Sequence, residues 1–276
     1  MLKRSILPLM LVGALSLAGC SPADSVTEPE VSSPSTIKYG DLAGPSHAEV
    51  VLILMEEAGV PAFRCTGTLI SPTVVLTAGH CTGAPGEFSG MRIFTESNVQ
   101  TGNNSYPFAG ANSVEALDWH THPDYTAAAF FQNDVGVIEL AAPVTLPAGS
   151  TYGVLPALNS LDALKPGPRS PFTAVGYGLQ FSNAHFATAF KVRMIATPNL
   201  LQINTGFTGS RSLMLSNNAN TGGTCFGDSG GPNYVGSSTV IGGVTSFAIN
   251  GSCAGTGGVF RMDRADVLAF VNGYLH

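Results

Sequence analysis

Short apolar runs separated by turn signals dominate this chain of 276 residues. A continuous apolar run at 49–55 suits a buried strand. Two further β-rich runs, at 63–70 and 73–77, are divided by a Ser-Pro turn signal. Later runs that predict strands lie at 91–95, 171–178, 190–197, 211–215, 240–248 and 257–262. The pattern predicts an all-β fold of many short strands, consistent with 33 glycines and 18 prolines.

The end of the chain predicts a helix. Asp263 is a residue type that caps helix N-termini, and Asp266 would lie in the first turn, where an acidic side chain is favourable. One apolar face would be formed by Val267, Leu268, Phe270, Val271 and Leu275. The length, with 44% hydrophobic residues, suffices for a buried core in one two-lobed unit or in two small domains.

The first residues have the features of a targeting segment. Lys3 and Arg4 precede an apolar run at 6–17 that is too short to span a bilayer. The run ends in Leu-Ala-Gly-Cys, which resembles the bacterial lipobox and implies removal of residues 1–19 and a lipid on Cys20. An ordinary secretory signal with a chance cysteine is the alternative. We expect export from a bacterial cell, with the protein lipid-anchored in the envelope (the outer membrane in a Gram-negative cell) or released.

Residues 20–36 are rich in proline and serine and contain no aromatic residue, so we expect a flexible tether before a domain at 37–276. The chain has 12 Lys and Arg against 18 Asp and Glu, a net charge of −6. It has no strong basic patch, which disfavours nucleic acid as a partner. Because an acidic chain is not attracted to anionic lipid, membrane attachment would depend on the lipid at Cys20.

Three motifs carry candidate chemistry. Residues 227–232 read Gly-Asp-Ser-Gly-Gly-Pro, and the glycines allow a turn in which the N–H groups of Gly227 and Ser229 point at one spot beside the serine hydroxyl. A hydroxyl is a weak nucleophile and needs an adjacent base. His80, within Thr-Ala-Gly-His-Cys, is a candidate base, and Asp134 begins the apolar strand of Asn-Asp-Val-Gly-Val-Ile-Glu-Leu. Alone, the serine motif would also suit a surface turn.

Together and in the order His, Asp, Ser, these motifs resemble the chymotrypsin/trypsin family of serine proteases from about residue 37 to the end. The resemblance implies two six-stranded antiparallel β-barrels with a C-terminal α-helix, joined by a crossover at about 141–171. It implies a monomeric, secreted or surface-anchored endopeptidase that acts on proteins or peptides and needs no metal or organic cofactor. Two alternatives are a catalytically silent binding protein on this fold, against which the intact triad argues, and an esterase-type hydrolase on another fold, against which the residue order argues.

The implied roles follow the chemistry of acyl transfer. Ser229 attacks the scissile carbonyl, His80 takes its proton and returns it to the leaving amine, and Asp134 orients His80 and stabilises its charged form. The N–H groups of Gly227 and Ser229 form the oxyanion hole.

Other polar residues near Asp134 suggest an alternative catalytic acid or a metal site. Asp118 and Asp124 are candidate acids, but only Asp134 begins an apolar strand that can bury a carboxylate. His120 and His122 alternate, as metal ligands can, yet the sequence His-Pro-x-Tyr resembles the family's approach to the catalytic acid. Residues 82–112 give no functional signal.

The resemblance also places a substrate pocket. Its positions fall on Gly223, Thr224, Ser246, Phe247, Ala248 and Gly258. Gly223, at the floor, brings no carboxylate, so a preference for uncharged apolar residues before the scissile bond is expected rather than one for Lys or Arg. Ala248 and Gly258 would form the walls, with Ala248 narrowing the mouth by about a methyl group, and 246–248 would pair with the substrate backbone.

The chain has five cysteines, and four remain if Cys20 carries lipid. Spacing leaves three connectivities open; the resemblance implies disulfides from Cys65 to Cys81 and from Cys225 to Cys253, which require an oxidising compartment. Zinc is the rival interpretation, but no C-x₂-C spacing occurs.

The family resemblance further implies a zymogen. Cleavage before Ile37 would free an amine that pairs with Asp228 and orders the oxyanion hole. The match to the family's new N-terminus is imperfect, because Thr36 precedes the cut and Lys38-Tyr39 follows Ile37. The alternative is that Asp228 has an internal partner and that no cut is required.

Overall fold

The computed structural model describes residues 37–129, 131–182, 185 and 187–275. The predicted signal peptide, the lipidation site Cys20 and the tether lie outside these residues. No helix in the described ranges is long and apolar enough to cross a membrane.

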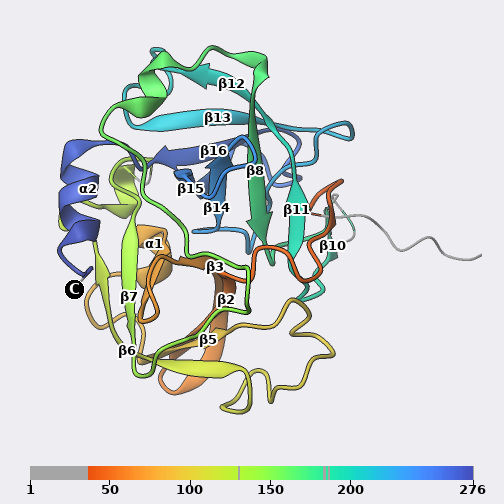
Figure 1. Cartoon of the computed structure of the whole chain (residues 1–276), viewed down its shortest axis with the longest axis vertical. Helices are drawn as coiled ribbons and strands as arrows, with labels where there is room; N and C mark the ends of the chain where they lie inside the picture. The colour runs from red at the N-terminus through yellow and green to blue at the C-terminus, as the bar shows by residue number, and fades with distance from the viewer. Residues whose placement is uncertain (1–36, 130, 183–184, 186, 276) are drawn as a thin grey trace, which may run out of the picture. The chain divides into compact units, whose positions relative to one another are not determined.

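The first of two β-barrels comes from the N-terminal half of the described chain (Figure 1). Its strands are antiparallel and close in the order β2 (Val50–Glu57), β3 (Val60–Leu69), β4 (Val74–Thr77), β7 (Gly136–Leu140), β6 (Ser113–Thr121) and β5 (Gly90–Phe94). Because β2 is buried along most of its length, its sequence is continuously apolar rather than alternating.

The second barrel follows after a connection that holds the short helix η2 (Ser160–Ala163). Its strands run in the order β8 (Gly167–Gly176), β12 (Asn199–Ile203), β13 (Ser212–Asn217), β16 (Gly255–Arg261), β15 (Ile241–Ala248) and β14 (Pro232–Val235). Pairing of β14 with β8 closes the barrel. The prediction of two six-stranded antiparallel barrels with a C-terminal helix is therefore confirmed.

Short elements complete the fold. Strand β11 (Met194–Ala196) extends the second barrel from β8, and β1 (Asp41–Leu42) pairs with β11. The others are the hairpin of β9 (Phe181–Ser182) and β10 (Ala187–Thr188), and the helices α1 (Gly79–Thr82), η1 (Ala127–Ala129) and α2 (Ala265–Asn272).

Two local predictions were wrong. Helix α2 begins after Arg264, not Asp263, because Asp263 is fully buried and binds the guanidinium of Arg261 instead of capping the helix. Of the barrel strands, the predicted set also lacks β6, β12 and β14. The exposed and half-buried residues of β6 include Glu115 and Asp118, so it has no apolar run to mark it.

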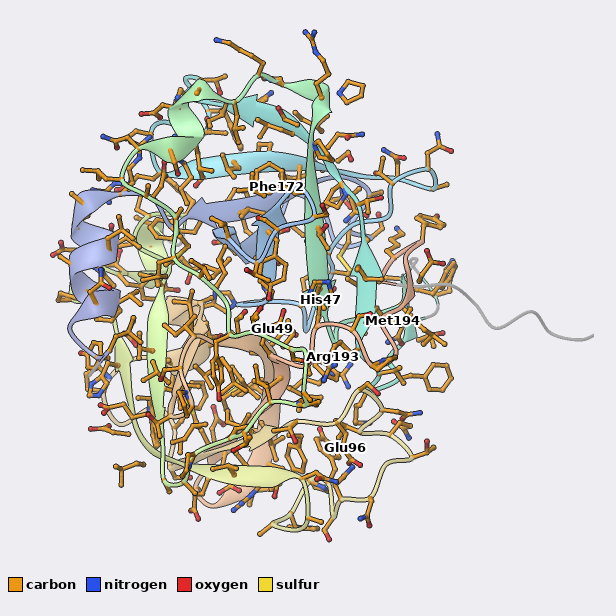
Figure 2. The ribbon with its side chains drawn as sticks, viewed as in Figure 1. His47, Glu49, Glu96, Phe172, Arg193 and Met194 are labelled. Atoms are coloured by element: carbon orange, nitrogen blue, oxygen red, sulfur yellow. A yellow bond between two sulfur atoms is a disulfide. The ribbon has the colours of Figure 1, made fainter. Side chains whose placement is uncertain are left out.

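A buried polar network joins the barrels, and Figure 2 labels three of its side chains. Arg193 donates to the Tyr177 hydroxyl and to two first-barrel carbonyls, and is 2% exposed. Glu49 accepts from the Tyr234 hydroxyl at 2.7 Å and pairs with His47 at 3.0 Å. Hydrogen bonds on every side offset the cost of burying these charges.

Candidate active site

The helix α1 follows β4 directly and presents His80 at the edge of the first barrel. A glycine precedes His80 because a Cβ atom on Gly79 would lie 3.2 Å from both the Tyr125 ring and the Val135 backbone. The His80 side chain is 32% exposed, so its ring is held by neighbours on one side and open on the other.

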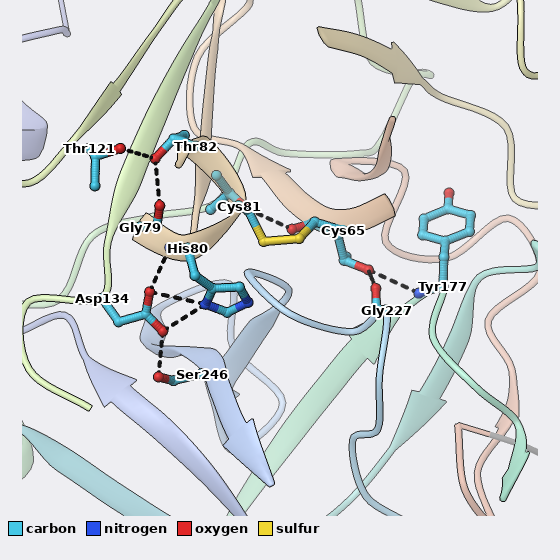
Figure 3. Close-up of a disulfide and its surroundings, with 12 residues drawn as sticks. Cys65, Gly79, His80, Cys81, Thr82, Thr121, Asp134, Tyr177, Gly227 and Ser246 are labelled. Carbon is cyan, nitrogen blue, oxygen red and sulfur yellow. Dashed lines mark hydrogen bonds and ion pairs between the residues drawn. A yellow bond between two sulfur atoms is a disulfide. The ribbon is translucent and has the colours of Figure 1, made fainter. Parts of the chain in front are cut away.

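Asp134 lies immediately before the buried end of β7 and is fully buried. Its carboxylate accepts from His80 three times: from the backbone N–H at 2.9 Å and from Nδ1 at 3.1 and 3.0 Å to its two oxygens. The Ser246 hydroxyl donates to the same carboxylate at 2.5 Å (Figure 3). The bond from Asp134 to Nδ1 leaves Nε2 as the proton-accepting nitrogen of a neutral His80 ring.

The charge of Asp134 sets the basicity of His80. Burial lowers the pKa of His80, but the hydrogen bond that Nδ1 donates to Asp134 and the negative charge of Asp134 raise it by more, so the pKa lies above the usual 6.5. A group with this pKa can act as a general base near neutral pH.

Ser229 lies in the loop before β14 and is half-buried. Ser229 and His80 line one cavity of about 290 Å³, whose other walls come from 224–226 and 245–248. Within the described ranges, the N–H groups of Gly227 and Ser229 donate to no other residue.

Comparisons with known proteins decide the family. The sequence model described as Trypsin matches residues 46–265. The chain belongs to the trypsin family of serine proteases. It is similar to brachyurin of Leptuca pugilator, with 30% identity covering 69% of this chain and 78% of that protein. A chymotrypsin of Phaedon cochleariae is 26% identical over 86% of this chain and 82% of its own.

Solved structures agree on the fold. HL collagenase has a TM-score of 0.64 at 18% identity, covering 82% of this chain and 93% of its own. A mutant of human heparin binding protein has a TM-score of 0.66 at 17% identity, covering 86% and 95%. At these identities the likeness concerns the fold alone.

The pocket of this trypsin-family chain differs from the predicted one at one wall. Ala248 pairs with Gly257 across β15 and β16, so these two residues share a face of the sheet. A Cβ atom on Gly257 would meet only the Thr224 hydroxyl, at 3.0 Å, whereas one on Gly258 would collide with the Phe247 ring at 2.3 Å. The predicted wall residue Gly258 does not line the cavity that holds Ser229, and it packs against the Phe247 ring instead.

The predicted floor of the pocket, Gly223, is covered by the side chain of Asn217. Gly223 is buried, and a Cβ atom there would lie 2.4 Å from Cγ of Asn217. Asn217 is 1% exposed and donates to the Thr224 carbonyl at 2.6 Å. Of the six predicted pocket residues, the four that line the cavity with Ser229 are Thr224, Ser246, Phe247 and Ala248.

Asp228 is the second fully buried carboxylate of the site. It accepts from the backbone N–H of Gly178 at 2.8 Å and of Cys225 at 2.9 Å. Burial raises the pKa of Asp228 to about 7, against the lowering effect of these two bonds. Ile37, its predicted activation partner, is fully buried beside Met194 and Ala196.

Disulfides join Cys65 to Cys81 and Cys225 to Cys253, the two pairings that the resemblance implies. The first ties α1 to β3 behind His80 (Figure 3). In the part of the chain that the structure describes, three potential metal ligands come together at Cys65, His80 and Cys81, but the disulfide occupies both sulfurs.

The other histidines have different partners. His120 lies 2.8 Å from Glu139 and stacks on Tyr274, and His122 accepts from the Asp124 backbone. Both line a larger cavity of about 1160 Å³ on the first-barrel side of His80, which also includes 82–88 from the region without a sequence signal.

Sequence reasoning missed the roles of two hydroxyl groups at the site: Ser246 was predicted only as a pocket residue, and Thr66 was not predicted at all. The contact of Ser246 with Asp134 spans 112 residues, and Thr66 contacts Gly227 across 161 residues. No local pattern marks either contact, because each depends on how the two barrels meet.

Proposed function

We propose that this chain is a serine endopeptidase in which Ser229 is the nucleophile, His80 the general base and Asp134 the residue that orients and charges His80. The observation that carries the proposal is the bonding of His80 Nδ1 to a fully buried carboxylate, with His80 sharing a cavity with Ser229. Membership of the trypsin family supports peptide or protein substrates.

The reaction follows from these positions. Ser229 Oγ attacks the carbonyl carbon while its proton moves to Nε2 of His80, and the resulting imidazolium is stabilised by Asp134. The carbonyl oxygen becomes an oxyanion that the N–H groups of Gly227 and Ser229 bind. His80 then protonates the leaving amine, and water repeats the sequence to release the acyl group.

The primary pocket favours uncharged apolar residues. No carboxylate is among its lining residues, the Ala248 methyl group lies in its lining, and Asn217 lies against the predicted floor residue Gly223. A buried cation without a partner would be costly. Cleavage profiling on a peptide library tests this preference, and a preference for Arg over Phe would contradict it.

The second candidate is a catalytically silent binding protein, and a structural neighbour on the same fold is named a heparin binding protein. Its polyanionic ligand does not suit a chain with 18 acidic and 12 basic residues. Replacing Ser229 by Ala separates the two functions. We expect peptide hydrolysis to fall on the order of 10⁴ to 10⁶-fold with an unchanged fold. A variant that keeps a tenth of the parent activity would refute the proposed nucleophile.

We further propose lipid attachment at Cys20 in a bacterial envelope, and activity without cleavage before Ile37. The first rests on the Leu-Ala-Gly-Cys sequence, the second on the two backbone N–H groups that already satisfy Asp228. N-terminal mass analysis of membrane and soluble fractions, with an activity assay on each, tests both. An unmodified Cys20, or an inactive uncut form, would contradict the corresponding part.

A further inference from the structure

The side chain of Thr66 lies against the loop that carries the proposed oxyanion donors. Thr66 is on β3, next to Cys65, and is fully buried. Its hydroxyl donates to the Gly227 carbonyl at 2.8 Å and accepts from the Tyr177 N–H at 3.1 Å. The hydroxyl of Thr66 thus bonds second-barrel residues both through its proton and through a lone pair.

The backbone of Thr66 holds the same loop. Its N–H donates to the Ser229 carbonyl at 2.8 Å, and its carbonyl accepts from the Thr77 hydroxyl at 2.9 Å. Gly227 and Ser229, the two residues whose N–H groups would bind the oxyanion, are therefore both tied through their carbonyls to one residue of the first barrel.

The hydroxyl bond matters most at Gly227. This residue has a φ of 95°, a conformation that glycine enters and leaves at little cost. Asp228 fixes the loop at Cys225, two residues before Gly227, and at Gly178. Among the described residues, Thr66 makes the one hydrogen bond to the Gly227 carbonyl. The Gly227 N–H group belongs to the preceding peptide, whose Phe226 carbonyl accepts from the Leu179 N–H at 2.8 Å. The Thr66 hydroxyl holds the following peptide, so the peptide planes on both sides of Gly227 are fixed.

We propose that Thr66 is a positioning residue whose hydroxyl, by holding the Gly227–Asp228 peptide, keeps Gly227 in the backbone conformation that presents its N–H group to the oxyanion in the uncut chain. The inference rests on the proposed peptidase function. It identifies a side chain of the first barrel that orders the oxyanion loop of the second.

The test compares three variants at position 66. Thr66→Val keeps the shape and removes the hydroxyl, so kcat should fall roughly 10- to 100-fold, somewhat less than the loss of an oxyanion donor itself. KM should stay within about threefold, because the bond acts on the transition state. Thr66→Ser keeps the hydroxyl and should restore kcat to within about threefold of the parent. Thr66→Ala replaces Thr66→Val if the latter does not fold.

A tetrahedral analogue gives a readout that a merely structural role would not change. When Ser229 Oγ adds to the carbon of a peptide trifluoromethyl ketone, its proton moves to His80 and the ketone oxygen becomes the oxyanion. The affinity of this inhibitor should fall in Thr66→Val by the same factor as kcat/KM. The acid limb of the pH profile should not move, because the His80–Asp134 pair is untouched.

Thr173→Val is the matched control. Thr173 is a mostly buried β8 residue whose hydroxyl donates to the Gly236 carbonyl at 2.6 Å, away from the site. The Thr173→Val variant should lose thermal stability as Thr66→Val does, but its kcat should equal that of the parent. Equal kcat in both variants, or no rescue by Thr66→Ser, would overturn the inference while leaving the proposed function intact. An inactive parent would refute the proposed function, and this inference with it.

Discussion

Two regions meet at the cavity and are built in opposite ways. Around His80 and Asp134, named side chains make the contacts: an imidazole, a carboxylate and the Ser246 hydroxyl. In the loop at 223–231, backbone groups take part in most of the contacts. At Gly230 and Gly231 a side chain is excluded, because Cβ atoms there would lie 2.0 and 2.6 Å from first- and second-barrel atoms. The first region depends on particular functional groups, and the second also depends on the absence of side chains at these glycines.

The two buried carboxylates show the same contrast. Asp134 accepts from an imidazole, whereas Asp228 accepts from two backbone N–H groups. Burial raises the pKa of Asp228 to about 7, against the lowering effects of these two bonds and of the Arg64 charge. In the proposed mechanism Asp134 serves the chemistry, and Asp228 serves the shape of the loop.

The largest effect is expected at the side-chain region. Asp134→Asn should lower kcat on the order of 10⁴-fold, because the amide no longer fixes the tautomer or stabilises the charged ring. The pKa of His80 should fall, since burial still lowers it and the opposing charge is gone. In the parent, activity should rise with pH through a pKa above 6.5. pH–rate profiles of parent and variant measure both effects, and an unshifted acid limb would contradict the pairing.

Adding one methyl group to the glycine-rich loop should cause a large loss of folding stability. Gly230→Ala places a Cβ atom 2.0 Å from the Thr77 hydroxyl at a φ of 78°, so unfolding free energy should drop by roughly 3–5 kcal/mol. Gly236→Ala is the control, since it has a φ of 60° and open space, and should lose only about 1 kcal/mol. Denaturant unfolding in a Ser229→Ala background measures both. Equal losses would show that close packing does not shape the loop.

The pH dependence of stability should identify Asp228. Its folded pKa of about 7 exceeds the usual 3.8, so the folded chain keeps a proton that the unfolded chain releases between these values. The contribution of Asp228 is full below about pH 4, is lost as pH rises to 7, and is constant above it. Relative to Asp228→Asn, the parent should lose on the order of 2–4 kcal/mol over this range. Parallel stability curves would argue against a proton on Asp228.

The smallest effect should come from the hydroxyl that sequence reasoning missed. Ser246→Ala removes the 2.5 Å bond to Asp134 and should lower kcat about three- to tenfold with little change in KM. Ser170→Ala, which removes a buried hydroxyl bonded to the Lys165 carbonyl, should leave kcat unchanged. Steady-state kinetics on one peptide substrate compare the two. A larger loss in the Ser170 variant would show that the effect is structural.

The sequence predicts the local parts of this site and misses the long-range ones. His80, Asp134 and Ser229 each lie in a short motif, and most strands follow from apolar runs. Strand register does not follow from composition, so the sequence did not show that Gly258 pairs with Phe247 and lies against its ring. Asp263 is of a residue type that often caps helices, but here it accepts from the buried guanidinium of Arg261, the last residue of β16. The roles of Thr66 and Ser246 require knowing which barrel edges meet.

Reaction with a fluorophosphonate tests the central claim most directly, because the reagent needs both regions at once: an activated hydroxyl and donors for the phosphoryl oxygen. The account predicts one adduct per chain, mapped by peptide mass spectrometry to Ser229, formed by uncut protein, and lost in Ser229→Ala. Its formation should be slowed on the order of 10³-fold or more in Asp134→Asn. A folded, disulfide-bonded parent that forms no adduct, or forms it at another residue, would contradict the account.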